Sequence, residues 1–370
     1  WQALDGKYYH DYTDDASWGP KMVGQEYIPW YAWYGGHSRS FQTAKLLPQP
    51  NNIRDFFNTG VTTTNNINFT RAGDNFNARV SYTNLDQKGL LPNEFLRRNT
   101  LNSNVSIDLG AHFTVSTNIN FVNQNRAAEN NDGYSNQSSG SFNQWFHRNI
   151  DIGILKELRG LRTPEGIYAS WNHGNPGSYS ASNPLAFYGG NYWFNHYSYF
   201  DNVTNRDFRN RLFGDVSFTY KLNSNFNIRG IYRRQQFNSN GYTIYPTELE
   251  NSANQASANP WEASNLAGYG TFSNTVTTQN YELIAGYTKK YKDWAFNANA
   301  GVVVNKQSEY RYAANTMGGL KLPGIYGLYN SVNDITNSFA SPNGVANLIR
   351  SEEHTSVLQS PYVISYAVFC

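Results

Sequence analysis

Aromatic side chains crowd two stretches of the sequence that lack regular alternation. The first, YIPWYAWYGG, contains two tryptophans, and the second, YASWNHGNPGSYSASNPLAFYGGNYWFNHYSYF, is richer still. Aromatic faces stack on sugar rings and on peptide side chains. We therefore expect candidate substrate-binding residues here, with packing between loops or against a covering protein as the alternative. The candidates are Trp30, Trp33, Trp171, Tyr192 and Trp193.

Other chemistry-bearing residues do not form a recognisable set. The histidines lack the spacing of metal ligands. The acidic run Asp11, Asp14 and Asp15 has the residue types of a calcium loop, but we favour a solvated loop. No G-x-S-x-G elbow, phosphate-binding loop or H-E-x-x-H motif occurs. The sequence thus predicts no metal, no cofactor and no enzymatic activity.

The composition favours a β protein with polar but uncharged surfaces. Of 370 residues, 39% are hydrophobic, 16% aromatic and only 15% charged, against roughly 25% charged in an ordinary soluble domain. The mean hydropathy is nevertheless −0.63, because Asn, Ser, Thr, Gln and Tyr are abundant. A net charge of +2 without a basic run gives no reason to expect a nucleic-acid partner. No apolar segment is long enough for a transmembrane helix.

Strand-like alternation recurs along the chain. In NFNARVSYTNLDQKGLLPN, Phe76, Ala78, Val80 and Tyr82 fall on one side, and polar residues fall on the other. A period of two is that of a β-strand. Seven further segments share this pattern, so we predict eight strands in four hairpins: 61–70 with the strand from Phe76, 97–109 with 112–124, 209–220 with 225–236, and 277–289 with 293–305.

The connections between these strands alternate in length. Turns within hairpins are short, near 71–75, 109–112, 221–224 and 290–293, and aromatic residues flank them, whereas segments 125–208 and 237–276 are long. Strands that are apolar outside and polar inside, with short turns at one end and aromatic girdles, are typical of a transmembrane β-barrel. Hydrocarbon cannot satisfy backbone polar groups, so such strands must pair with one another. The polar inner positions predict a wide, water-filled ring.

Three blocks of sequence carry a resemblance to a known family. SWGPKMVGQ (17–25), PNNIRDFFNTG (50–60) and SYTNLDQKGLLPN (81–93) closely resemble the SusC/RagA family of TonB-linked outer-membrane transporters of Bacteroidota. The resemblance covers residues 1 to about 349. It implies an antiparallel barrel of about 22 strands with an N-terminal plug. It also implies import of glycans, peptides or other bulky nutrients, driven by the TonB–ExbB–ExbD complex beneath a SusD-like surface lipoprotein.

The strand pattern predicts three regions, and the resemblance implies an integral location in the cell outer membrane, in contact with its lipid. Residues 1–60 would form an outer loop with a short helical segment, and 61–349 a partial barrel with long extracellular loops. The plug and later strands are absent, so we expect a fragment. Segment Arg350–Cys370 resembles a translated sequencing adapter and would be a non-native tail. The alternative function is that of a soluble or surface glycan-binding or adhesive β protein.

Overall fold

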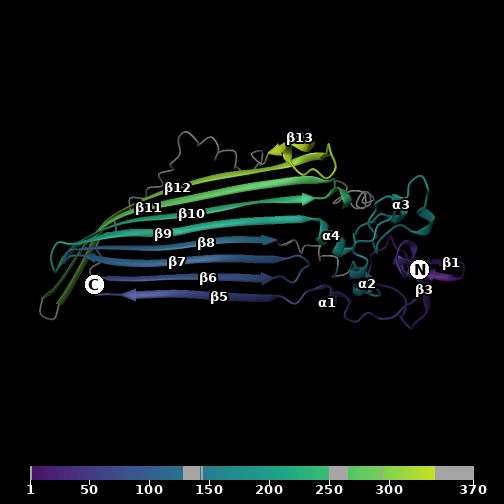
Figure 1. Ribbon diagram of the computed structural model, residues 1–370, viewed down its shortest axis with the longest axis horizontal. Coiled ribbons are helices and arrows are strands. Elements are labelled where there is room, and N and C mark those ends of the chain that lie inside the picture. Colours follow the sequence, from purple (N-terminus) through teal and green to yellow (C-terminus); the bar gives the residue numbers. More distant parts are fainter. Residues whose placement is uncertain (1, 128–141, 143–144, 250–265, 292–293, 338–370) are drawn as a thin grey trace.

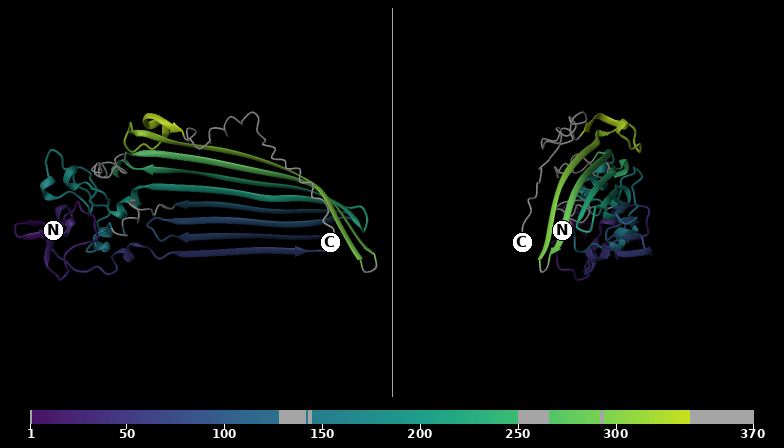
Figure 2. Two further views of the ribbon diagram at one scale, coloured as in Figure 1. Left: turned by 180° about the vertical axis from the view of Figure 1, so that it is seen from behind. Right: turned by 90° about the vertical axis from the view of Figure 1, so that its left-hand side faces the viewer.

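The chain folds into a long curved sheet with a smaller domain at one end (Figure 1). The computed structural model describes residues 2–127, 142, 145–249, 266–291 and 294–337. Figure 2 shows the sheet from behind and along its strands, where its curvature is visible. The predicted tail, Arg350–Cys370, lies outside the described residues.

The large sheet contains nine antiparallel strands in the order β13-β12-β11-β10-β9-β8-β7-β6-β5, and β5 and β13 form its two edges, so it is not closed. All eight predicted strands are confirmed. A ninth, β13, was not predicted. Their bounds are β5 Val61–Ala72, β6 Phe76–Lys88, β7 Phe95–Leu109, β8 Phe113–Ala127, β9 Thr204–Lys221, β10 Phe226–Tyr245, β11 Gly268–Tyr291, β12 Trp294–Leu320 and β13 Ser331–Asn337.

Several strands are longer than the sequence predicted. β10, β11 and β12 have 20, 24 and 27 residues. Strand β10 pairs with β11 without interruption from Phe226 to Tyr245. The connections are accordingly shorter than predicted, 128–203 and 246–267 instead of 125–208 and 237–276. In the added stretch 237–245 of β10, apolar and polar residues occur on both faces, so the alternation that marks a strand in the sequence is lost there although the backbone still pairs.

The smaller domain, which we call the end domain, comprises residues 2–60, 142 and 145–203. It has a four-stranded sheet and short helices, and both aromatic-rich stretches lie within it (Figure 1). No helix in the described part of the chain is long and apolar enough to cross a membrane. Its elements are β1 Gln2–Leu4, β2 Lys7–Tyr9, β3 Glu26–Ile28, β4 Ala44–Lys45, α1 Asn52–Phe56, α2 Ile152–Glu157, α3 Leu185–Tyr188, α4 His196–Asn202, and the 3-10 turns η1 Trp30–Trp33 and η3 Pro176–Ser178. A further 3-10 turn, η5 Leu328–Asn330, precedes β13.

A core of large aromatic side chains holds the end domain together. Helix α1 forms within NNIRDFF and places Phe56 in this core, whereas Phe57 stays 38% exposed. Each buried aromatic removes roughly 150–250 Å² from water, which lets a segment with little regular structure fold. The aromatic members include Tyr9, Tyr12, Trp30, Tyr31, Tyr34, Phe56, Phe142, Phe146, Trp171, Trp193, Tyr197 and Phe200.

Candidate functional site

The two faces of the large sheet differ sharply in polarity. Directly opposite residues of an antiparallel pair share a face. The register therefore places Val80, Tyr82 and Leu101 on one face with apolar residues of every strand from β5 to β12. These side chains remain exposed, Phe69 by 72% and Leu109 by 57%. We call them the apolar belt: Ile67, Phe69, Val80, Tyr82, Leu101, Ile107, Leu109, Ile119, Phe121, Phe218, Tyr220, Ile228, Tyr281, Leu283, Tyr287, Phe296, Val302 and Val304.

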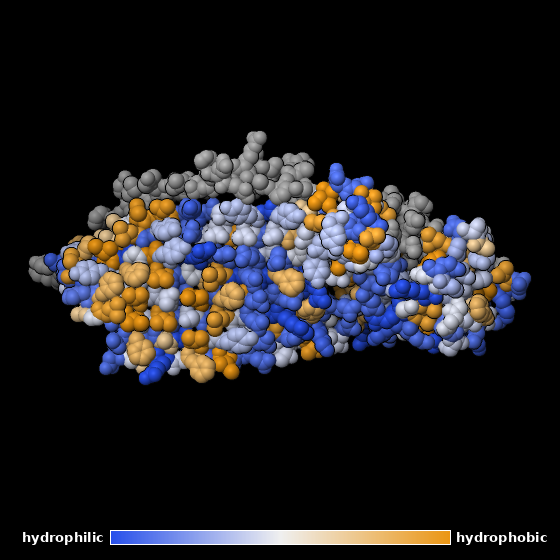
Figure 3. Space-filling model, turned by 45° about the horizontal axis from the view of Figure 1, so that its top comes forward, coloured by the Kyte–Doolittle hydropathy of each residue, from blue (hydrophilic) through white to orange (hydrophobic). Residues whose placement is uncertain are grey.

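The apolar belt occupies only the part of the sheet near the short hairpin turns. Figure 3 shows hydrophobic side chains gathered at that end and hydrophilic ones toward the end domain. On β7 the belt runs from Leu101 to Leu109, and on β8 the residues opposite this stretch are Phe121 to Phe113. This height matches the roughly 9–11 tilted residues with which a strand crosses hydrocarbon. The strands continue well beyond the belt as a polar extension.

A row of asparagines crosses six strands immediately beyond the belt, on the same face. We call it the asparagine ladder. Asn84 donates through Nδ2 to Asn99 Oδ1 at 2.9 Å, and Asn123 donates through Nδ2 to Asn210 Oδ1 at 2.7 Å. The Tyr82 hydroxyl of the belt also donates to Asn99 Oδ1, at 2.8 Å. The sequence did not reveal this row, because it depends on inter-strand register. Its members are Asn65, Asn84, Asn99, Asn123, Asn210 and Asn238.

The opposite face is mostly polar and carries a charged cluster near the end domain. Asp207, on β9, accepts hydrogen bonds from Arg126 Nε at 2.9 Å and from Arg209 Nε at 3.2 Å. Ser239 on β10 donates to the same carboxylate at 3.3 Å. The side chain of Asp207 is only 9% exposed. Reading the sequence did not single out these residues, which lie far apart along the chain.

The five aromatic residues predicted to contact substrate come together in the end domain. Trp30, Trp171 and Trp193 are buried in its core, and Trp33 and Tyr192 pack against that core while partly exposed. The structure thus places them where the alternative, packing between loops, expects them. Substrate contact by these residues stays a prediction.

Polar atoms of this core are tied to distant parts of the chain. The Tyr34 hydroxyl donates to the carbonyl of Tyr188 at 2.8 Å and accepts from the Ser170 amide at 3.2 Å. The buried amide of Asn172 donates to the carbonyl of Tyr12 at 2.6 Å. Burial raises the pKa of the Tyr34 hydroxyl, so it remains a neutral donor. These bonds join residues 2–60 to residues 145–203.

The acidic residues Asp11 and Asp15 accept hydrogen bonds from other residues of the end domain. Burial acts to raise the pKa of Asp11, but hydrogen bonds from Thr13 and Asn175, both 2.6 Å, outweigh it and hold that pKa below its usual value. Burial raises the pKa of Asp15, which accepts from the indole of Trp193. Within the described residues, no group of three or more His, Cys, Asp or Glu side chains is arranged to hold a metal ion.

Buried histidines line the same core. The rings of His10 and His147 lie 3.7 Å apart between centroids. Burial lowers the pKa of both, and for His147 the neighbouring His10 adds to the effect. Burial also lowers the pKa of His173 to about 4, against the opposing effect of nearby carbonyls, and that of His196 to about 3. These four rings are therefore neutral at neutral pH.

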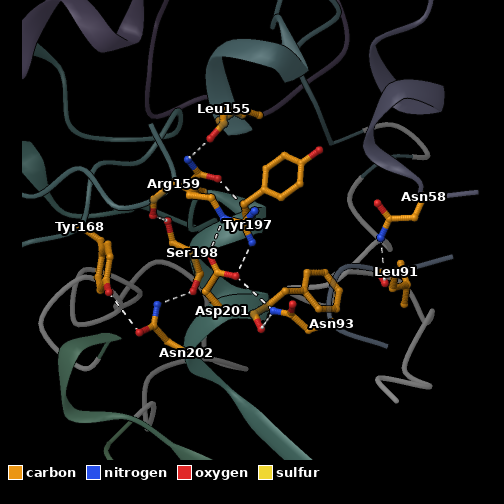
Figure 4. A network of polar contacts seen from close by, with 12 residues as sticks. Asn58, Leu91, Asn93, Leu155, Arg159, Tyr168, Tyr197, Ser198, Asp201 and Asn202 are labelled. Carbon is orange, nitrogen blue, oxygen red and sulfur yellow. Dashed lines mark hydrogen bonds and ion pairs between the residues drawn. The ribbon is translucent and has the colours of Figure 1, made fainter. Parts of the chain in front are cut away.

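A polar network fastens the end domain to the large sheet (Figure 4). Asn93, in the loop between β6 and β7, donates to the carbonyl of Phe200 at 2.9 Å and to Asp201 Oδ1 at 3.1 Å. Arg159 forms an ion pair with Asp201 and lies 5.1 Å above the Tyr197 ring. A cleft of about 850 Å³ lies beside this network, lined among others by Asn93, Phe95, Asp201 and Arg206.

An antiparallel sheet with one apolar face, one polar face and all short turns at one end has the form of a stretch of membrane β-barrel wall. Solved structures share this fold. Three structures of the RagAB peptide importer or transporter align with TM-scores of 0.55, 0.54 and 0.52 at 12%, 14% and 12% identity. They cover 77%, 77% and 75% of this chain.

The aligned part is 29%, 29% and 28% of those longer chains, so this chain spans less than a third of their length. At this identity the likeness shows the fold alone. No protein-family model matches the chain, and no curated protein matches it.

Proposed function

We propose that the chain forms part of the wall of a TonB-dependent outer-membrane transporter of the SusC/RagA type. The wall faces lipid with its apolar belt and faces a water-filled lumen with its polar side. The transporter imports a bulky nutrient, a glycan or a peptide. Its partners are a SusD-like surface lipoprotein and the TonB–ExbB–ExbD complex. The protein carries its substrate and does not transform it.

The observation that carries this proposal is the height of the apolar belt. Side chains such as Phe69, Leu109 and Leu283 are exposed to an extent that water disfavours. They stop after about one hydrocarbon thickness on adjacent strands, at the asparagine ladder. A membrane explains both the exposure and the common limit.

The alternative, a soluble glycan-binding or adhesive protein, requires a cover over the same side chains. In the described residues the end domain packs at one end of the sheet, where the network around Asn93 and Asp201 holds it. The belt lies toward the other end (Figure 3). The large exposed area supports the membrane protein over the soluble one.

Two neighbouring positions on β6 test the proposal. We would replace Cys370 by serine and introduce either Val80→Cys, in the belt, or Ser81→Cys, on the polar face, into the full chain. In isolated outer membranes, a water-soluble maleimide should label the cysteine at 81 and leave the one at 80 unmodified. Both should react after denaturation, which is the matched control. Equal labelling at the two positions in native membranes, or absence of the protein from that fraction, would refute a lipid-facing belt.

A further inference from the structure

We propose that the polar face binds carboxylate groups of the transported substrate at four arginines, which we call the arginine patch: Arg98 on β7, Arg126 on β8, and Arg209 and Arg211 on β9. The inference rests on the proposed function, because it assigns a substrate chemistry to the same wall. The carboxylates belong to an acidic oligosaccharide or to an acidic oligopeptide, two sources of one chemistry.

Strand register places the patch on one face. Gln124 on β8 lies directly opposite Arg98 on one side and Arg209 on the other, so these three side chains form a row. Arg126 and Arg211 are two residues from this row along their own strands and therefore share the face. Neighbouring strands are about 4.8 Å apart, so the row spans about 10 Å. The patch lies at the end-domain side of the belt.

The patch has an excess of positive charge. Asp207 is the acidic side chain that pairs with it in the described residues, 2.8 Å from Arg126 Nη2 and 2.7 Å from Arg209 Nη2. Four guanidinium groups against one carboxylate leave a charge of +3 (4 − 1 = 3). Arg98 and Arg211 are exposed, and the described residues provide neither with an ion pair. Both are thus available to a ligand.

Two other arginines on the same face are matched by an acid of their own, whereas Arg79 and Arg229 stand singly, opposite uncharged residues. Arg233 forms an ion pair with Glu282, and Arg311 forms one with Glu309. Those carboxylates are mostly buried, with side chains 12% and 18% exposed. The polar face does not need unpaired charges to stay hydrated, because its amide and hydroxyl side chains already form hydrogen bonds with water. The excess on β7 to β9 differs from the paired and single arginines because its cations are clustered, as a ligand with several carboxylates requires.

A cavity of about 550 Å³ lies next to the patch, and Gln124 and Arg126 are part of its lining. Ligand pockets are commonly about 300–1,000 Å³. Glu94 contributes a carboxylate to the cavity, but it already accepts a hydrogen bond of 3.2 Å from the Leu91 amide. Other residues of the cavity are Gly60, Thr62, Gln87, Lys88, Gly89, Leu90, Phe95 and Leu96.

The side-chain chemistry selects carboxylates. The planar guanidinium fork donates two parallel hydrogen bonds to a carboxylate. Between Arg98 and Arg209, the amide of Gln124 suits a neutral hydroxyl or peptide group. An extended oligomer lying across the strands would thus contact the guanidinium of Arg98, the amide of Gln124 and the guanidinium of Arg209 in turn, over about 10 Å. Lipid headgroups do not reach this face, since the belt is on the other one.

The test compares charge removal on the two faces of the sheet. We would purify the full chain in detergent and measure binding of fluorescent hexaglutamate and of an oligogalacturonate, with hexaglutamine and a neutral oligosaccharide as uncharged probes. The patch variant is Arg98→Gln with Arg211→Gln, two exposed residues without an ion pair. The matched control is Arg97→Gln with Arg234→Gln, which removes the same charge from the opposite face. An Arg211→Lys variant keeps the charge and loses the fork.

The proposal expects one acidic probe to bind, its affinity to fall with added salt, and the patch variant to lose about tenfold or more. The control should bind like the unmodified chain, and Arg211→Lys should lie between. Whichever acidic probe binds identifies the source of the carboxylate. Equal binding by both double variants, binding of neither acidic probe, or equal binding of uncharged probes would overturn the proposal. Because labelling at positions 80 and 81 is measured separately, these results leave the transporter proposal standing.

Discussion

The indole N–H of Trp193 donates a hydrogen bond of 2.8 Å to Asp15 Oδ2, across 178 positions of sequence. This bond links the second aromatic-rich stretch to the acidic run near residue 15 and leaves the indole nitrogen satisfied inside the core. Trp193, one of the residues predicted to contact substrate, thus also stabilises the core of the end domain.

Removing the donor should weaken the end domain. Trp193→Phe deletes the bond and leaves the partly buried Asp15 carboxylate without the indole, so we expect a loss of about 1–3 kcal/mol in the free energy of unfolding. Asp15→Asn keeps an oxygen that accepts the indole hydrogen bond and removes a carboxylate whose burial is unfavourable, since burial raises the pKa of Asp15. This variant should therefore leave the free energy of unfolding almost unchanged. Urea unfolding followed by tryptophan fluorescence measures both. An equal loss in the two variants would contradict this role for the bond.

Acid should destabilise the end domain through its buried histidines. In the unfolded chain His173 and His196 take up protons near pH 6.5, whereas in the fold their pKa values are about 4 and about 3. The unfolded state thus binds more protons as the pH falls below 6.5, and the stability present above that pH is lost. By pH 5 each should contribute about 2 kcal/mol of destabilisation. Proteolysis of the end domain between pH 7.5 and 5 reports it.

A histidine replacement checks the source of that pH dependence. His196 stacks on Phe142 at 4.6 Å between ring centroids, so His196→Phe keeps an aromatic ring at that place. The variant should show a shallower loss of stability below pH 6.5. His112→Asn, in a hairpin turn at the far end of the sheet, should keep the original slope. An unchanged slope in His196→Phe would show that other groups control the transition.

Charge placed in the middle of the apolar belt should impair membrane insertion. Val105→Arg puts a cation on the apolar face of β7, and Asn104→Arg puts the same cation on the polar face one residue away. The first should cost about 2–4 kcal/mol, the range for arginine near the bilayer midplane. The second should be tolerated. Folding yield into lipid vesicles compares them, and equal yields would argue against lipid on this face.

Close packing around Gly241 in the polar extension should make its replacement by a larger residue destabilising. A Cβ on Gly241 of β10 would overlap the carbonyl oxygen of Arg206 and lie 2.7 Å from the Phe272 ring. Gly241→Ala should therefore cost about 1–3 kcal/mol through overpacking. At Gly230 on the same strand nothing lies within 4 Å of an added Cβ, so Gly230→Ala should leave the unfolding midpoint almost unchanged. Thermal unfolding by circular dichroism would distinguish the pair, and similar midpoints would exclude the steric effect.

The sequence predicted the strands of the belt well, because apolar and polar residues alternate along them. Leu101 to Leu109 and Phe113 to Phe121 alternate cleanly. Beyond the belt apolar and polar residues no longer alternate by face, so the ends of β10 and β11 were missed. Strand β13 was also missed; its pairing with β12 is irregular, with register shifts near Met317.

Site prediction was limited by contacts between distant residues. The aromatic stretches were recognised, but their burial depends on partners more than a hundred positions away, such as the Tyr188 carbonyl for Tyr34 and Asp15 for Trp193. Arg98 and Arg209 were equally invisible as neighbours, because only the register of β7, β8 and β9 brings them into one row. Alternation specifies which face a residue occupies but leaves its neighbour across the strand undetermined.

The asparagine ladder helps to determine which residues of neighbouring strands lie opposite one another. A strand whose register shifted by two residues would keep its apolar and polar faces, so the polarity pattern alone would not oppose this register error. Asn99 would then face Tyr82 or Asp86 in place of Asn84, and the amide pair would be lost. The bonded amide pairs Asn84–Asn99 and Asn123–Asn210 therefore penalise a two-residue misalignment that hydrophobic patterning tolerates.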